Sequence, residues 1–244
     1  MKAQTDYEDI WRDVWGDMQR YGPVHRHHRR IFHEMLRDVD ASGIGSIVEF
    51  GCGEASNLVS VGQRFPNAEL YGFDISETAL QRARSHVKGR FSLLDIQKEA
   101  PNRRFDLSIC SDVLEHLEDD VAAIEHIHEV TNRYALISTL QGRMRAFEKQ
   151  IGHLRNYKRG ELQRLLASAG FEIAKVIEWG FPLYSPLYRD FLAIGSAEEL
   201  TRGDYGPLKK TLCNLLYGVF SLNSHTHGDA IFVLLKKRES RKKL

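Results

Sequence analysis

The stretch that decides the fold is SIVEFGCGEAS, residues 46–56, in which an apolar run passes directly into a glycine loop. The run 46–50 is short and rich in β-branched and aromatic residues, as in a buried strand. Gly51 and Gly53 let the backbone approach a ligand closely where this strand passes into a helix. A third small residue, Ser56, follows at dinucleotide-motif spacing, so the loop alone is also compatible with nicotinamide dinucleotide binding.

Outward from this loop, short apolar segments alternate with amphipathic ones, which is the pattern of βαβ units and a parallel sheet. The predicted strands are residues 46–50, 69–74, 90–94, 105–110, 134–140, 171–178 and 229–236. Helices fit between the first five strands, and a further helix is predicted over 159–169, ending at Gly170. Two more helices, over 5–20 and 24–39, precede the first strand.

Composition excludes several classes of protein. The chain has 244 residues, of which 42% are hydrophobic, enough for one large α/β domain with additions. Its net charge of +1 provides no overall basic field, so we expect no nucleic-acid partner. Three cysteines, without disulfide or metal-site spacing, indicate a reducing compartment. The acidic start and the lack of a membrane-length apolar run predict a cytoplasmic protein without a transmembrane segment.

Carboxylates at the strand ends help to separate the cofactor classes. Asp74 closes the second strand, where it can accept hydrogen bonds from both ribose hydroxyls, as in nicotinamide enzymes. Asp95 and Ile96 follow the third strand at the position for an adenine ring. Glu49 stands just before the glycine loop, where its charge repels a pyrophosphate and favours a cationic ligand.

With these pieces in order, the chain resembles class I S-adenosylmethionine-dependent methyltransferases, in particular the small-molecule group known as methyltransferase type 11 or ubiquinone-biosynthesis-like. The matched segments are VEFGCG (48–53), Asp74, LDI (94–96), FDLSICSDVLEHL (105–117), HLRNY (153–157) and Glu161-Leu162. The resemblance implies an α/β, Rossmann-like, seven-stranded, mostly parallel sheet with helices on both faces. Its order would be 3-2-1-4-5-7-6, with strand seven antiparallel.

The resemblance also implies the cofactor, S-adenosyl-L-methionine, and its ligands. These are Glu49, Gly51, Cys52, Gly53, Asp74, Ile75, Asp95, Ile96 and Ser111. In the family, the glycine loop faces the methionine part of the cofactor, the acid after strand two holds the ribose, and the pair after strand three flanks the adenine. Glu49 would support the site near the amino group, and Ser111 would lie near the sulfonium.

Three parts of the chain are predicted from this resemblance. Residues 1–42 form an N-terminal helical cap, 43–179 with 229–238 form the methyltransferase core, and 180–228 form a substrate-side insertion between strands six and seven. Within this insertion, Tyr184 and Tyr188 are predicted to contact the substrate. Packing between the sheet edge and the inserted helices is the alternative role for these rings.

The acceptor is expected to be a small metabolite or biosynthetic intermediate, such as a lipid-quinone precursor, methylated at O or N rather than at C. Methyl transfer depends chiefly on alignment, and a base helps where the acceptor is a hydroxyl or ammonium. His116 and His153 follow strands four and five at the rim where the acceptor must lie, so both are predicted to be catalytic. A structural role in the loop is the alternative for each.

Two basic segments have competing interpretations. HRHHRR, residues 25–30, predicts a polar helix face, and we expect no metal because no further ligand follows at the required spacing. The cluster Arg143, Arg145, Lys149 and Arg155 would either hold an acidic acceptor or form a solvated helix face.

Three other functions compete with a methyltransferase acting on small molecules. A non-catalytic module that binds the cofactor is disfavoured by the intact glycine loop and ribose acid. A nicotinamide dehydrogenase is disfavoured by the acids of strands one and three. An RNA methyltransferase is disfavoured by the near-zero net charge. The N-terminal helices are candidates for a lid or for a homodimer face.

Overall fold

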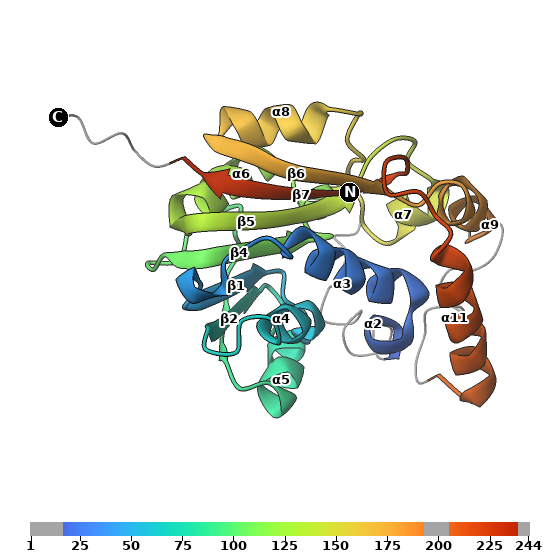
Figure 1. The fold of residues 1–244 in the computed structure, drawn as a ribbon, viewed down its shortest axis with the longest axis horizontal. Helices are drawn as coiled ribbons and strands as arrows, with labels where there is room; N and C mark the ends of the chain where they lie inside the picture. The colour runs from blue at the N-terminus through green and yellow to red at the C-terminus, as the bar shows by residue number, and fades with distance from the viewer. Residues whose placement is uncertain (1–16, 193–204, 239–244) are drawn as a thin grey trace, which may run out of the picture.

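The computed structural model describes residues 17–192 and 205–238, and in them seven strands form one sheet of order β3-β2-β1-β4-β5-β7-β6 (Figure 1). The first five strands are parallel, and β7 runs antiparallel to both β5 and β6. The predicted strand order and the antiparallel last strand are confirmed. The strands are β1 Ser46–Phe50, β2 Glu69–Asp74, β3 Arg90–Leu93, β4 Phe105–Ser111, β5 Thr131–Leu140, β6 Phe171–Trp179 and β7 Ala230–Lys237.

Only the start of β5 differs from the predicted strands by more than one residue. β5 begins at Thr131, three residues earlier than expected, because Thr131 pairs with Phe105 across an irregularity in β4. The Thr131 hydroxyl also donates a hydrogen bond to the Ile127 carbonyl and is hydrogen-bonded to the Ser108 hydroxyl. The polar residues 131–133 hide this extension from an apolar pattern.

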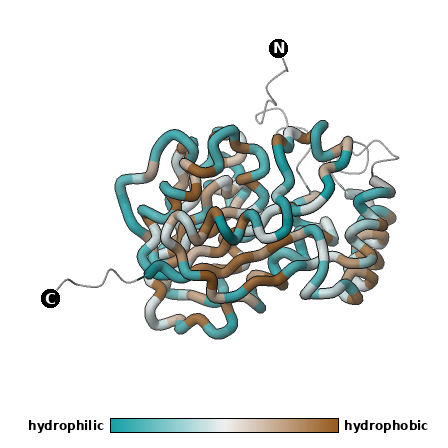
Figure 2. Tube along the Cα trace, turned by 90° about the horizontal axis from the view of Figure 1, so that it is seen from above, coloured by the Kyte–Doolittle hydropathy of each residue, from teal (hydrophilic) through white to brown (hydrophobic). Residues whose placement is uncertain are grey.

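Helices cover both faces of the sheet. On one face, Ile47 and Leu107 pack with α3 Pro23–Met35, α4 Ser56–Gly62 and α5 Glu77–His86. On the other face, Val48 and Cys110 pack with α6 Asp120–Val130 and α8 Glu161–Ser168. Figure 2 shows the resulting brown, apolar strands enclosed by more hydrophilic segments. Since side chains alternate between the faces of a strand, the apolar runs of these parallel strands supply both cores.

The helices before β1 differ from the prediction in character. The predicted helix 5–20 lies mostly outside the described residues, which contain α2 Asp17–Tyr21. In α3, the expected polar face of residues 25–30 is wrong for His27 and His28, which are 0% and 4% exposed. The reason is that α3 lies between the sheet and α11 Pro207–Phe220, so these imidazoles pack against Trp179.

The segment between β6 and β7 contains the π-helical turn η3 Leu183–Tyr188, then α9 Arg189–Leu192, and α11. In Figure 1, α11 stands beside α2 and α3, beyond the end of the sheet to which β1 and β4 point. The remaining short elements are η1 Ala41–Gly43, η2 Leu114–His116 and α7 Ala146–Gln150. Among the described residues, no helix has both the length and the apolar character needed to cross a membrane.

Candidate active site

A cavity of about 510 Å³ lies between the glycine loop, the N-terminal helices and α11. Of the residues predicted for the site, eight line this cavity: Gly51, Cys52, Gly53, Ser111, His116, His153, Tyr184 and Tyr188. Five others, Glu49, Asp74, Ile75, Asp95 and Ile96, do not line it. The structure therefore joins the glycine loop to the predicted catalytic and substrate residues and separates them from the strand-end acids.

The glycine loop has a conformation that requires glycine. Gly51 and Gly53 have φ values of +67° and +53°, in the left-handed region. A Cβ atom on Gly51 would lie 2.3 Å from a methyl carbon of Val113. The N–H groups of Gly51 and Cys52 donate to the Phe73 carbonyl at 2.7 and 3.0 Å, which fixes the loop against β2.

Asp74 holds this loop from the neighbouring strand. Its Oδ2 accepts a hydrogen bond from the Gly53 N–H at 2.8 Å, and its Oδ1 accepts one from the Ser76 N–H at 3.0 Å. The side chain is buried, whereas the following Ile75 is 51% exposed. Asp74 thus positions the loop backbone, and its contact with a ribose stays a prediction.

Glu49 lies behind the loop, where α4 begins. Its carboxylate accepts hydrogen bonds from Asn57 Nδ2 and from the Leu58 N–H, both at 3.0 Å. Burial raises the pKa of Glu49 to about 8. Glu49 therefore stabilises the first turn of α4 and does not line the cavity.

Asp95 and Ile96 follow β3, away from the cavity. The Asp95 carboxylate accepts a hydrogen bond from the Gln97 N–H at 3.2 Å and pairs with Lys98 at 2.9 Å. Ile96 is buried, and its carbonyl binds His126 Nδ1 at 2.7 Å. Their predicted contact with an adenine is not tested by this geometry.

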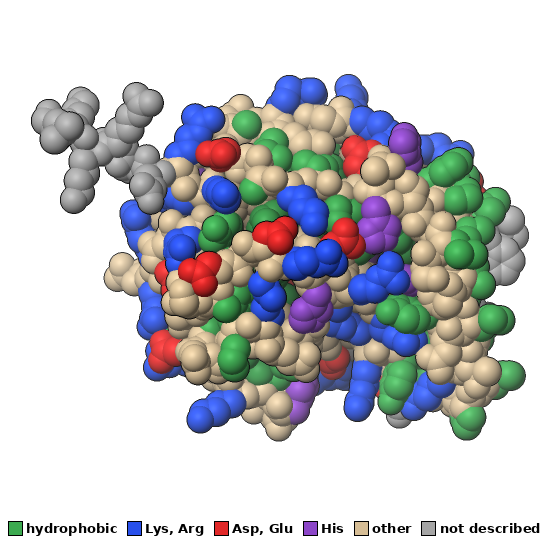
Figure 3. All heavy atoms as spheres, viewed as in Figure 1, with side chains coloured by type: hydrophobic (Ala, Val, Ile, Leu, Met, Phe, Trp, Pro, Cys, Tyr) green, Lys and Arg blue, Asp and Glu red, His purple; other side chains and the backbone are tan. Residues whose placement is uncertain are grey.

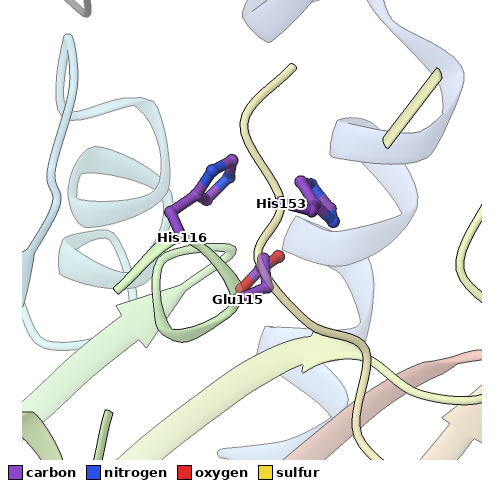
Figure 4. A group of neighbouring side chains, drawn as sticks. All are labelled: Glu115, His116 and His153. Atoms are coloured by element: carbon purple, nitrogen blue, oxygen red, sulfur yellow. The ribbon is translucent and has the colours of Figure 1, made fainter. Parts of the chain in front are cut away.

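His116 and His153 both line this cavity and lie against each other, and a catalytic role for either stays a prediction. Their ring centroids are 4.6 Å apart and nearly perpendicular. Burial lowers the pKa of each to about 4, so both rings are neutral at pH 7. Figure 4 shows the Glu115 side chain beside the two rings, below both of them in this view. Its carboxylate accepts a hydrogen bond from Thr139 Oγ1 at 2.7 Å, and burial raises its pKa to about 8.

The sequence did not predict a second polar pair in the cavity wall, formed by His28 and Asp112. His28 Nδ1 lies 3.2 Å from Asp112 Oδ2, across a separation of 84 residues. Burial acts to raise the pKa of Asp112, but His28, His25 and Ser111 together outweigh it and lower that pKa to about 2. Asp112 also has a φ of +55°, an uncommon conformation directly after β4. Its place at a strand end was a usable signal, whereas nothing local marks His28 as its partner.

The two tyrosines have the packing role that was the alternative for them, and their contact with a substrate stays a prediction. Tyr184 stacks on Trp179 with ring centroids 4.9 Å apart, and Tyr188 meets Phe220 edge-on at 5.1 Å. Both also line the cavity. They pack the inserted segment against the sheet while presenting surface to the cavity.

The four basic residues after β5 were predicted either to hold an acidic acceptor or to form a solvated helix face, and they do not behave as one group. Arg145 is buried and pairs with Asp190 at 2.6 Å and with Asp229 at 3.2 Å. Arg155 donates hydrogen bonds to backbone carbonyls of the turn around Leu114. These two guanidinium groups are occupied internally, whereas Arg143 and Lys149 are exposed, so only part of the cluster is a solvated face.

Sequence comparisons match only part of the chain. A family model described as a methyltransferase domain matches residues 48–136. Trans-aconitate 2-methyltransferase of Methylobacterium radiotolerans is 30% identical over 95 residues, which are 38% of this chain and 36% of that protein. The chain thus spans less than half the length of this curated relative.

Solved structures share the fold over most of the chain. Magnesium protoporphyrin IX methyltransferase of Synechocystis PCC 6803, with bound S-adenosylmethionine, has a TM-score of 0.58 and 18% identity, with 96% of this chain and 93% of that one covered. N-methyltransferase NodS of Bradyrhizobium japonicum WM9 has a TM-score of 0.59 and 14% identity, with coverage of 96% and 98%. At these identities the likeness establishes the fold alone.

Proposed function

We propose that the chain is a class I S-adenosylmethionine-dependent methyltransferase and that it methylates an oxygen atom of a small acceptor with a largely apolar body. Nitrogen is the second choice of acceptor atom, and carbon the third. The N-terminal helices and the 180–228 segment would select the acceptor, since both contribute to the cavity wall. A homodimer and a cytoplasmic location stay predictions.

The residues at the strand ends fit S-adenosylmethionine. The left-handed glycines expose backbone to a ligand, and Asp74 fixes them in place. When bound, S-adenosylmethionine supplies a methyl group whose bond to sulfur breaks as a bond to the acceptor atom forms, with S-adenosylhomocysteine as the coproduct. The ionised Asp112 on the cavity wall favours a positively charged ligand there.

The far end of the cavity suits a hydroxyl on an apolar body. Tyr184, Tyr188 and Leu216 contribute apolar surface to the cavity wall, and His116 and His153 contribute polar groups to it. A neutral imidazole can accept the proton that an acceptor hydroxyl loses on methylation. Because Arg145 and Arg155 are occupied internally, a strongly acidic acceptor such as a tricarboxylate is less favoured.

The single observation that carries the acceptor proposal is this pair of neutral imidazoles at the end of an apolar cavity. The test is incubation with methyl-labelled S-adenosylmethionine and a panel of hydroxylated aromatics, quinols, amines and carboxylic acids, trans-aconitate included. We expect label and S-adenosylhomocysteine to appear first with a hydroxylated aromatic or quinol. Turnover of trans-aconitate alone would contradict the proposal.

The competing functions predict different results. A non-catalytic module would bind S-adenosylmethionine without transferring label to any acceptor. An RNA methyltransferase would bind RNA with an affinity that falls steeply with salt. Basic and acidic side chains are interspersed on the face shown in Figure 3, which favours a small acceptor over a polyanion.

A further inference from the structure

Within residues 17–192 and 205–238, one group of three metal-ligating side chains converges, namely Glu115, His116 and His153. Glu115 and His116 belong to η2, and His153 follows α7 from the other side of the cavity rim (Figure 4). One ligand atom from each residue lies within 4.8 Å of those of the other two. Metal–nitrogen bonds of about 2.1 Å place two ligands at most about 4.2 Å apart, so small side-chain rotations complete the contact.

The backbone holds these residues together without help from a ligand. The Leu154 N–H donates to the Glu115 carbonyl at 2.8 Å, and the His153 N–H donates to the Glu148 carbonyl at 2.9 Å. These bonds fix the loop after α7 against η2. The three side chains are therefore presented by a preorganised turn and loop rather than by two independent segments.

Outer contacts match those that orient metal ligands. Thr139 Oγ1 donates to Glu115 Oε2, and the His116 ring is hydrogen-bonded to the backbone of Gly152. Carboxylate and imidazole ligands in metalloproteins are typically held by such partners, which fix the ring and aim the free lone pair at the ion. Asn156 acts to raise the pKa of His153. The Nδ1 atom of His153 has no hydrogen-bond partner among the described residues.

The third feature of this site is the environment of the Glu115 carboxyl group. The Glu115 carboxylate is 1% exposed and, among the described side chains, has no Lys or Arg in an ion pair with it. The nearby Arg189 is bound to Glu148 and Asp229. A divalent cation here would supply the positive partner that this buried carboxyl group needs in its ionised form.

We propose that Glu115, His116 and His153 bind a divalent first-row transition cation at the acceptor end of the cavity, leaving open positions for an acceptor oxygen. Two imidazoles with one carboxylate favour Mn²⁺, Co²⁺ or Zn²⁺ over Mg²⁺ and Ca²⁺, which prefer all-oxygen ligands. The cation would polarise the acceptor hydroxyl and ease loss of its proton. The identity of that open ligand rests on the proposed function, and the two imidazoles then act as ligands rather than as proton acceptors.

The test uses the full chain without an affinity tag, stripped with a chelator and titrated with Co²⁺ while visible d–d absorption is recorded. We expect a saturable signal at one equivalent. His153→Ala and the near-isosteric Glu115→Gln should weaken Co²⁺ binding at least about 100-fold, and Thr139→Val about 10- to 100-fold. His227→Ala, at an exposed position outside the cavity, should bind as the wild type does.

A wild-type protein without a saturable Co²⁺ signal would overturn the metal site. So would Glu115→Gln or His153→Ala protein that is folded by circular dichroism and binds Co²⁺ as tightly as wild type. Calorimetry with S-adenosylmethionine on the stripped protein separates this result from the proposed function. Cobalt binding without cofactor binding would contradict the methyltransferase and leave the metal site, whereas the reverse would return His116 and His153 to the role of proton acceptors.

Discussion

The two ends of the cavity are stabilised in different ways. At the cofactor end, neighbouring parallel strands bring their ends together, and Asp74 holds the glycine loop through backbone hydrogen bonds. At the acceptor end, segments far apart in the chain meet through buried charges, as in the contact of Arg189 with Glu148 and Asp229. The first arrangement follows from the fold, and the second depends on individual side chains that can be exchanged as the acceptor changes.

The largest effect on stability is expected from the acceptor end. The side chains of Arg189 and Glu148 are both 0% exposed. Arg189→Ala would leave the buried Glu148 without its cation, while Asp229 keeps Arg145, and would lower the free energy of unfolding by about 3–5 kcal/mol. Urea unfolding measures this change. The matched control is Arg90→Ala, since Arg90 pairs with Glu69 at the surface and should contribute at most about 1 kcal/mol. Equal effects of the two variants would remove the distinction between buried and surface pairs.

The largest effect on cofactor binding is expected at Asp74. Asp74→Asn keeps the shape of the side chain but loses the charge that accepts two backbone N–H groups. We expect binding of S-adenosylmethionine to weaken by about 1.5–3 kcal/mol, or roughly 10- to 150-fold, measured by calorimetry.

The control for Asp74 is Asp106→Asn, at the other end of the sheet. Asp106 Oδ2 also accepts hydrogen bonds from two backbone N–H groups, those of Gly45 and Ser46, both at 3.0 Å. This variant should lose stability while it binds S-adenosylmethionine as the wild type does. A similar loss of cofactor affinity in both variants would mean that Asp74 acts only through stability.

A smaller effect concerns the pH dependence of stability at the cofactor end. Burial raises the pKa of Glu49 to about 8 in the folded protein, so between about pH 4.5 and 8 the folded state holds a proton that the unfolded state has lost. The contribution of Glu49 to the free energy of unfolding therefore falls as pH rises through this range. Glu49→Gln should flatten that slope in urea unfolding series without cofactor. An unchanged slope would contradict the protonated, buried state of Glu49.

The smallest effect is expected at the aromatic wall. Tyr188→Ala removes one ring from the cavity, and an aromatic contact contributes about 0.5–1.5 kcal/mol. We expect KM for the best acceptor of the panel to rise about three- to tenfold, with unchanged affinity for S-adenosylmethionine. Tyr188→Phe should behave as the wild type does. A change in the affinity for S-adenosylmethionine would mean that Tyr188 contacts the cofactor rather than the acceptor.

The difference between the two ends also explains what the sequence could predict. The strands, the glycine loop and the strand-end acids follow from local patterns, because each is contained in a few consecutive residues, whereas the strand order was implied by the family resemblance. His116 and His153 were predicted because both follow strands on the same rim.

Side-chain partners at the acceptor end have no such pattern. His28 meets Asp112 across 84 residues, and Arg145 meets Asp229 across the same separation. Part of the basic segment 25–30 is buried between the sheet and α11, in apolar surroundings. Composition alone does not indicate this burial. Glu49 and Asp74 were predicted as cofactor ligands from their positions in the sequence. The structure adds that both accept hydrogen bonds from backbone N–H groups, which no local pattern indicates.

The most direct test of the central claim is calorimetric titration of the folded chain with S-adenosylmethionine and, separately, with NAD. The account predicts saturable 1:1 binding of S-adenosylmethionine, weakened by Asp74→Asn and not by Asp106→Asn, and no binding of NAD. Binding of NAD, or no binding of S-adenosylmethionine by protein that is folded by circular dichroism, would contradict it.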